Sequence, residues 1–115
     1  MAFWREHEAT GEFSDTNDAA EVLSELARTE PETAWEAIFQ ILSLVEAKPE
    51  NPLFQSLAAG PLEDLLSEHG RSIIDRVELE ARRSPSFNLL LGGVWQGGMP
   101  ADVWERIQKC RLRAW

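Results

Sequence analysis

The stretch TEPETAWEAIFQILSLV, residues 29–45, decides the fold class. Its first four residues are a helix start, because proline fits the first helical turn and Glu32 is placed for a capping box. From residue 34 to residue 45 apolar side chains recur every three to four positions, and they leave only a thin polar stripe. A helix that is apolar over most of its circumference is usually central to a helical core, so we expect an all-α protein.

Proline and glycine divide the rest of the chain into segments with the same helical spacing. N-cap residues at 14–18 predict a first helix that ends near Thr29. After the central helix we expect five more: one at 52–58, one from Pro61 to a left-handed C′ Gly70, one carrying Ile73 to Ala81, one capped by Ser84-Pro85, and one opened by Pro100. The sequence thus predicts about seven helices in one domain, 1–115, with no sheet. Residues 1–13 either pack onto the body or form a loose N-terminal arm.

An internal repeat suggests how the helices pack. NPLFQSL at 51–57 and SPSFNLL at 84–90 both read cap-Pro-x-Phe-x-x-Leu, 33 residues apart, and ILSLVE at 41–46 matches IIDRVE at 73–78. Periods of this length are typical of stacked helical hairpins. We therefore predict a HEAT-like, solenoid-like stack in which the two phenylalanines have equivalent environments. The alternative is an irregular helical bundle.

The stretch AAGPLEDLLSEHG, residues 58–70, resembles the signature of an uncharacterised family of short bacterial helical proteins. The resemblance continues through Pro85, Phe87 and the pair Val94-Trp95, covers about 40 residues, and leaves out the first helix, Trp35 and the basic tail. It implies a helical fold and a bacterial origin. The family has no settled activity, so the resemblance implies no functional residue.

The net charge of −9 is unevenly distributed, since residues 1–69 hold 15 acidic and 3 basic side chains and residues 70–115 hold 5 and 8. An acidic surface repels phosphate, so we expect no nucleic acid as partner. It attracts a basic protein and speeds the encounter, although acidic side chains can also simply keep a surface solvated. The predicted partner surface consists of six carboxylates on the first two helices: Asp15, Asp18, Glu21, Glu25, Glu32 and Glu36.

No residue pattern predicts catalysis, a cofactor or a metal ion. Glu63, Asp64 and His69 lie at helix ends, where acids in the first turn and a cation in the last turn stabilise the helix dipole. Cys110 fits a small packed hydrophobe, and the chain has only two histidines. The glycine-rich segment 92–98 lacks the Gly-Lys-Ser/Thr of a phosphate cradle and is interpreted as a turn.

The five tryptophans are interpreted by position. Trp35, Trp95 and Trp104 lie on or beside apolar stripes and are expected in the core. Trp4 and Trp115 lie at the ends of the chain, where an exposed tryptophan would be a binding anchor.

A single cysteine, no apolar run of about 20 residues and no signal-peptide pattern predict a cytoplasmic protein without a membrane partner. The leading functional hypothesis is a non-enzymatic protein–protein interaction. One candidate is an immunity protein that neutralises a basic bacterial toxin, by analogy in size and charge. The alternative is a scaffold or subunit of a bacterial complex, and an enzyme ranks third.

Overall fold

The computed structural model describes the backbone of residues 12–115 and the side chains of residues 21–115. Its elements are α2 (Glu12–Thr29), α3 (Pro31–Leu42), α4 (Pro52–Leu57), the π-helical turn η1 (Ala58–Leu62), α5 (Glu63–Arg83), α6 (Pro85–Leu91) and α7 (Ala101–Cys110). Residues 12–115 contain no strand, which confirms the all-α class. Residues 12 and 13, expected in the arm, already belong to α2, and the rest of that predicted arm lies outside the described residues.

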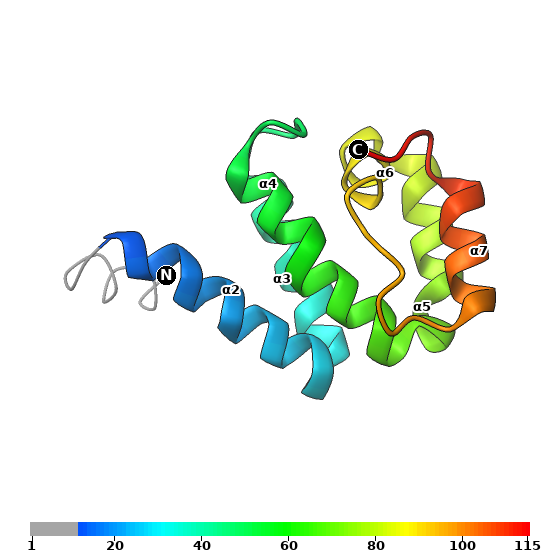
Figure 1. Ribbon diagram of the computed structural model, residues 1–115, viewed down its shortest axis with the longest axis horizontal. Helices are drawn as coiled ribbons and strands as arrows, with labels where there is room; N and C mark the ends of the chain where they lie inside the picture. The colour runs from blue at the N-terminus through cyan, green and yellow to red at the C-terminus, as the bar shows by residue number, and fades with distance from the viewer. Residues whose placement is uncertain (1–11) are drawn as a thin grey trace.

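The elements α4, η1 and α5 follow one another without a break and form a single bent rod from Pro52 to Arg83 (Figure 1). The sequence predicted a break at Gly60-Pro61, but the chain passes this point as a π-helical turn. A proline inside an α-helix lacks the N–H donor and its ring collides with the carbonyl four residues earlier; the wider turn accommodates both. With this rod counted once, the described residues form five helices, so the prediction of seven is not supported.

The rod bends at His69, whose backbone leaves helical geometry with φ −128° and ψ 16°. Gly70 was expected as a left-handed helix terminator, but Gly97 is the only described residue with a positive φ. Gly70 serves close packing instead, because a Cβ atom there would lie 2.9 Å from Cγ1 of Val103 on α7. The glycine therefore lets α7 approach α5 directly.

The repeated motif forms locally but does not repeat in the fold. Asn51 accepts a hydrogen bond from the Leu53 amide at 3.1 Å, and Ser84 accepts one from the Phe87 amide at 3.2 Å, so both segments are capped as the motif predicts. The segments before them differ. Residues 43–51 separate α3 from α4, whereas α5 reaches α6 through Ser84 alone.

The two phenylalanines of the motif have different neighbours. Phe54 stacks on Trp115 with ring centroids 5.6 Å apart, whereas Phe87 stacks on Phe39 at 4.9 Å and meets the edge of Trp35 at 5.9 Å. The solenoid-like stack is therefore not supported. The described chain is the irregular helical bundle that the sequence left as the alternative.

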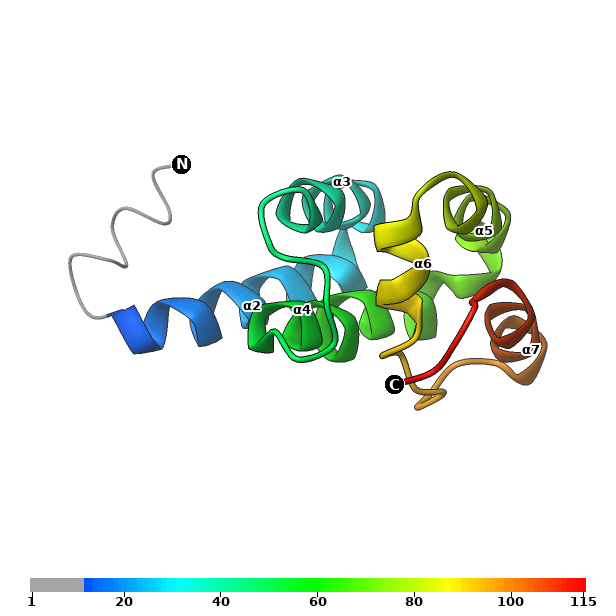
Figure 2. The ribbon, with the colours of Figure 1, turned by 90° about the horizontal axis from the view of Figure 1, so that it is seen from above.

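Figure 2 shows how the helices are layered. The α3 helix and the second part of α5 lie along one side, α2 and the first part of the rod along the other, and α6 between them. The bent rod, not α3, supplies the largest share of the core, ten of its 22 buried apolar residues: Phe54, Leu57, Ala58, Leu62, Leu65, Leu66, Ile73, Ile74, Val77 and Ala81. No helix in the described part of the chain combines the length and the apolar character that crossing a membrane requires.

Candidate functional site

The acidic residues of α2 face outward because the opposite face of this helix is buried. Leu23 and Ala27, four residues apart, are 6% and 0% exposed. The same helical period then turns Glu21, Glu25 and Arg28 toward the solvent, where they line one shallow depression. The structure therefore brings together two of the six carboxylates that the sequence selected.

Arg28 links this part of α2 to the start of α5. Its guanidinium lies 2.8 Å from the Glu25 carboxylate and 3.7 Å from that of Asp64. The hydrogen bond that Arg28 donates to Glu25, with the nearby charges of Asp64 and Glu68, raises the pKa of Arg28. One cation thus lies among several acids, and we name this region the α2–α5 acidic surface: Glu21, Glu25, Glu63, Asp64 and Glu68, with Arg28 among them.

His69 and Glu63 stabilise neighbouring segments, not the ends of their own helix. The Nε2 atom of His69 donates to the Arg28 carbonyl at 2.8 Å and so satisfies a free carbonyl in the last turn of α2. Oε1 of Glu63 accepts from the amide of Trp95 at 2.9 Å. Both side chains hold the bundle together across different elements, a role that helix-end signals in the sequence could not predict.

The remaining residues of the predicted partner surface lie elsewhere. Glu32 accepts two hydrogen bonds from Arg76, at 2.6 and 2.9 Å, which lower the pKa of the Glu32 carboxyl. Glu36 lines a separate depression between α3 and α5, together with Glu80. The side chains of Asp15 and Asp18 lie outside the described residues. The binding role of all six stays a prediction.

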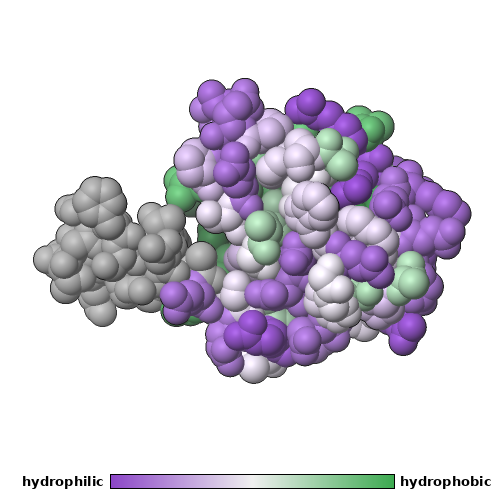
Figure 3. Space-filling view, in the orientation of Figure 1, coloured by the Kyte–Doolittle hydropathy of each residue, from purple (hydrophilic) through white to green (hydrophobic). Residues whose placement is uncertain are grey.

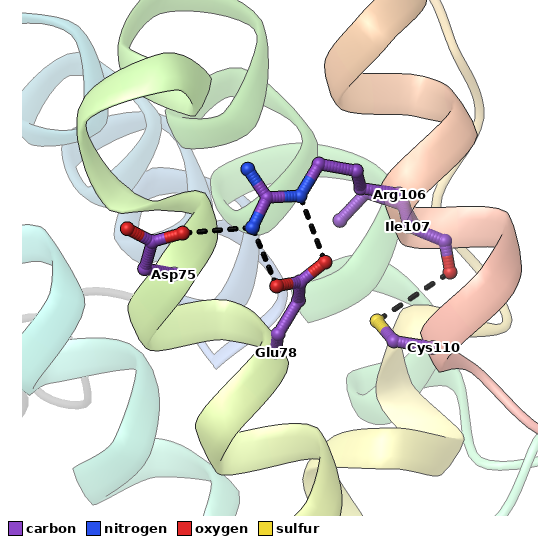
Figure 4. A network of polar contacts seen from close by, with 5 residues as sticks. All are labelled: Asp75, Glu78, Arg106, Ile107 and Cys110. Carbon is purple, nitrogen blue, oxygen red and sulfur yellow. Dashed lines mark hydrogen bonds and ion pairs between the residues drawn. The ribbon is translucent and has the colours of Figure 1, made fainter.

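Every acidic side chain after residue 70 pairs with a basic residue of the same part of the chain. Arg106 on α7 donates to Asp75 at 2.7 Å and, through two nitrogens, to Glu78 (Figure 4). These bonds lower the pKa of Glu78 and raise that of Arg106. The other three acids after residue 70 are paired in the same way: Glu80 with Arg83, Asp102 with Arg71, and Glu105 with Lys109.

The tryptophans are distributed differently from the expectation. Trp35 and Trp104 pack against the core as predicted. Trp115 is not an exposed anchor: its indole donates to the Leu89 carbonyl at 2.6 Å and stacks on Phe54. Trp95 is 69% exposed, so its prediction as a core residue is wrong. The sequence did contain a signal for this exposure: glycine pairs precede and follow Trp95, and they place it in a loop and not on the apolar stripe of a helix.

Cys110 packs against the core, where its thiol donates to the Ile107 carbonyl at 3.6 Å (Figure 4). Burial raises the pKa of this thiol, which opposes formation of the reactive thiolate. Among the described side chains, no group of three His, Cys, Asp or Glu residues could hold a metal ion.

The described residues form a small helical bundle with an acidic surface. A comparison with protein-family models identifies the family to which the chain belongs. Residues 6–115 match the model of a family of unknown function (DUF6869), so the chain belongs to this family. The match extends beyond residues 58–95, where the resemblance was seen, and includes the first helix, Trp35 and the basic tail. The chain matches no curated protein and no solved structure.

Proposed function

We propose that this chain is a non-enzymatic protein-binding domain whose partner is a basic protein. The observation that carries the proposal is the position of the unpaired carboxylates. Among residues 21–115, the acidic side chains without a described cationic group within 4.0 Å all precede residue 70: Glu21, Glu30, Glu36, Glu50, Glu63 and Glu68.

Three of these six carboxylates belong to the α2–α5 acidic surface, where Glu25, Asp64 and Glu68 lie around one arginine. The face of the molecule in Figure 3 is largely hydrophilic, and its apolar areas are small and separate. Like charges held on one surface repel each other. A basic partner would remove that repulsion, and the field of the surface would accelerate the encounter.

Among basic partners we favour a bacterial toxin, which would make the chain an immunity protein. A small acidic helical protein could cover the basic active face of a toxin such as a nuclease. This step rests on analogy in size and charge. A bacterial origin and a cytoplasmic location belong to the same proposal, and a free cysteine fits a reducing compartment. The alternative is a scaffold or subunit of a bacterial complex, whose partner need not be basic.

The test combines capture from the native cell with association kinetics. We would use the full chain, a Glu21→Lys/Glu25→Lys variant, and a Glu46→Lys/Glu50→Lys control with the same charge change on the connection between α3 and α4. Association of the captured partner would be measured at about 50 and 300 mM salt, a range over which the screening length shortens about 2.5-fold.

If the proposal holds, the partner is basic, and the α2 variant associates more slowly with a weaker salt dependence than the control variant. Circular dichroism should show the helices unchanged. An acidic or uncharged partner would favour the scaffold alternative. An association rate that changes neither with salt nor with the α2 substitutions would contradict binding at this surface.

A further inference from the structure

The loop between α6 and α7 holds Trp95 in a fixed position at the edge of the α2–α5 acidic surface. In Figure 1 this loop runs down toward the bend of the rod. The two residues that flank its exposed part, Val94 and Met99, are only 2% and 3% exposed. Trp95 between them is 69% exposed, so the chain turns a large aromatic side chain outward from a buried base.

Three contacts from other elements hold this base. The Glu63 carboxylate accepts from the Trp95 amide, and the Arg111 guanidinium donates to the Val94 carbonyl at 3.2 Å. The ring of Trp115 covers Gly93, where a Cβ atom would lie 2.4 Å from it. The loop is therefore built into the fold, and the exposure of Trp95 is not a consequence of a loose segment.

The Glu63 carboxylate has binding capacity left beside this tryptophan. Its Oε1 atom accepts from the Trp95 amide, while Oε2 lies toward Gly97, 3.2 Å from the position that a Cβ atom would occupy. No described cation lies within 4.0 Å of it. A carboxylate oxygen accepts more than one hydrogen bond, and bonds from a guanidinium or ammonium group are the strong ones.

We propose that Trp95 and Glu63 together receive a cationic side chain, an arginine or a lysine, of a basic protein partner. The face of an indole attracts a cation, and tryptophan is enriched among the residues that dominate binding energy. The adjacent carboxylate supplies the charge-assisted hydrogen bond, and Asp64 and Glu68 on the same helix extend the negative field. The inference deepens the proposed function and rests on it.

The test uses the ¹⁵N-labelled full chain and a short capped peptide of alternating arginine and glycine, with a glutamate–glycine peptide as the negative probe. Binding is followed by the NMR shifts of the Trp95 indole, assigned by its loss in Trp95→Phe, and of the Gly97 amide. Glu63→Gln removes the charge but keeps an oxygen that can accept from the Trp95 amide. Glu50→Gln is the matched control, because Glu50 is exposed, has no described cation within 4.0 Å, and lies on the connection between α3 and α4.

We expect saturable shifts at Trp95 and Gly97 with the arginine peptide only. Trp95→Ala, followed through Gly97, and Glu63→Gln should each weaken binding roughly two- to fivefold, the change that an exposed cation–π contact represents. Glu50→Gln should leave the affinity unchanged. The spectrum of the free Glu63→Gln variant should keep its Gly97 resonance, which separates loss of charge from loss of the loop.

Two results would overturn the inference in different ways. If only the resonances of Glu21 and Glu25 shift and that of Trp95 does not, Trp95 and Glu63 do not bind the cationic side chain, but the basic-partner proposal stands. No saturable shift at any residue, or equal shifts with the glutamate peptide, would count against both.

Discussion

Residues 70–115 pair all five of their carboxylates with cations, whereas residues 21–69 leave six of their ten without a described cation within 4.0 Å. The C-terminal region uses its charges to join α5 to α7, as Arg106 does with Glu78. Residues 21–69 thus hold most of their carboxylates without a cation from the described part of the chain. Both regions are rich in acids or bases, so charge density alone does not distinguish them. The difference lies in whether the fold itself supplies a cation to each carboxylate.

The largest expected effect concerns the C-terminal segment 111–115, which packs against both regions through Trp115. Trp115 lies against Phe54 of the rod and over Gly93, so Trp115→Ala should destabilise the protein by about 3 kcal/mol. Leu112→Ala is the control: this side chain is 88% exposed, so the change should stay within about 0.5 kcal/mol. Urea unfolding monitored by circular dichroism measures both.

A double substitution sharpens this test. Gly93→Ala should be destabilising in the native chain, because its Cβ would meet the Trp115 ring. The same change should cost much less in the Trp115→Ala background, since the clash is gone. If the losses in free energy of unfolding from the two substitutions simply add, the Trp115 ring does not pack against Gly93 as described.

The next effect tests the pairing of the C-terminal region directly. Arg106→Met keeps most of the apolar stem but leaves Asp75 and Glu78 beside each other without their cation. We expect a clear fall in Tm. Lys109→Met, which breaks an exposed pair one helical turn away, should lower Tm less. Equal effects would mean that the Arg106 network is no more than a surface ion pair.

Acid should weaken two pairings of the C-terminal region, Glu78 with Arg106 and Asp102 with Arg71. Hydrogen bonds from Arg106 and Arg71 lower the pKa values of Glu78 and Asp102 below their ordinary range. A carboxyl whose pKa is lower in the folded state adds stability above its unfolded pKa, and this stability is lost as the pH falls through the folded value. Tm should therefore fall from about pH 4 downward. Glu78→Gln should flatten that slope, and an unchanged slope would contradict the assignment.

The smallest effect should have the opposite sign. Glu21→Gln/Glu68→Gln removes two charges from the α2–α5 acidic surface, where repulsion and not pairing dominates. We expect stability to stay equal or to rise, by at most about 0.5 kcal/mol. Glu78→Gln removes only one charge, but a paired one, and should be destabilising. If both variants lose stability equally, the contrast between the two regions is wrong.

The sequence by itself determined the helical class, the capped starts of α4 and α6 and the uneven charge. These features depend on signals within one helical turn: Asn51 and Ser84 cap the helices that follow them, as their motif predicts. The apolar spacing likewise marked many of the buried residues, such as Ile38 and Leu66, although Val22 and Leu44 on the same apolar stripes are exposed. Helix caps and apolar periods act locally, so they can be recognised without knowing the rest of the fold.

Only the tertiary structure decided how these helices continue and what each charge meets. Whether Pro61 ends a helix or passes through a π-helical turn depends on the packing around it, because the same residues allow both. Arg76 meets Glu32 across 44 residues of chain and Arg106 meets Glu78 across 28, so no local pattern indicates which acids are neutralised. The exposure of Trp95 has the same origin: Glu63, Arg111 and Trp115, all distant in the sequence, fix the loop that turns it outward.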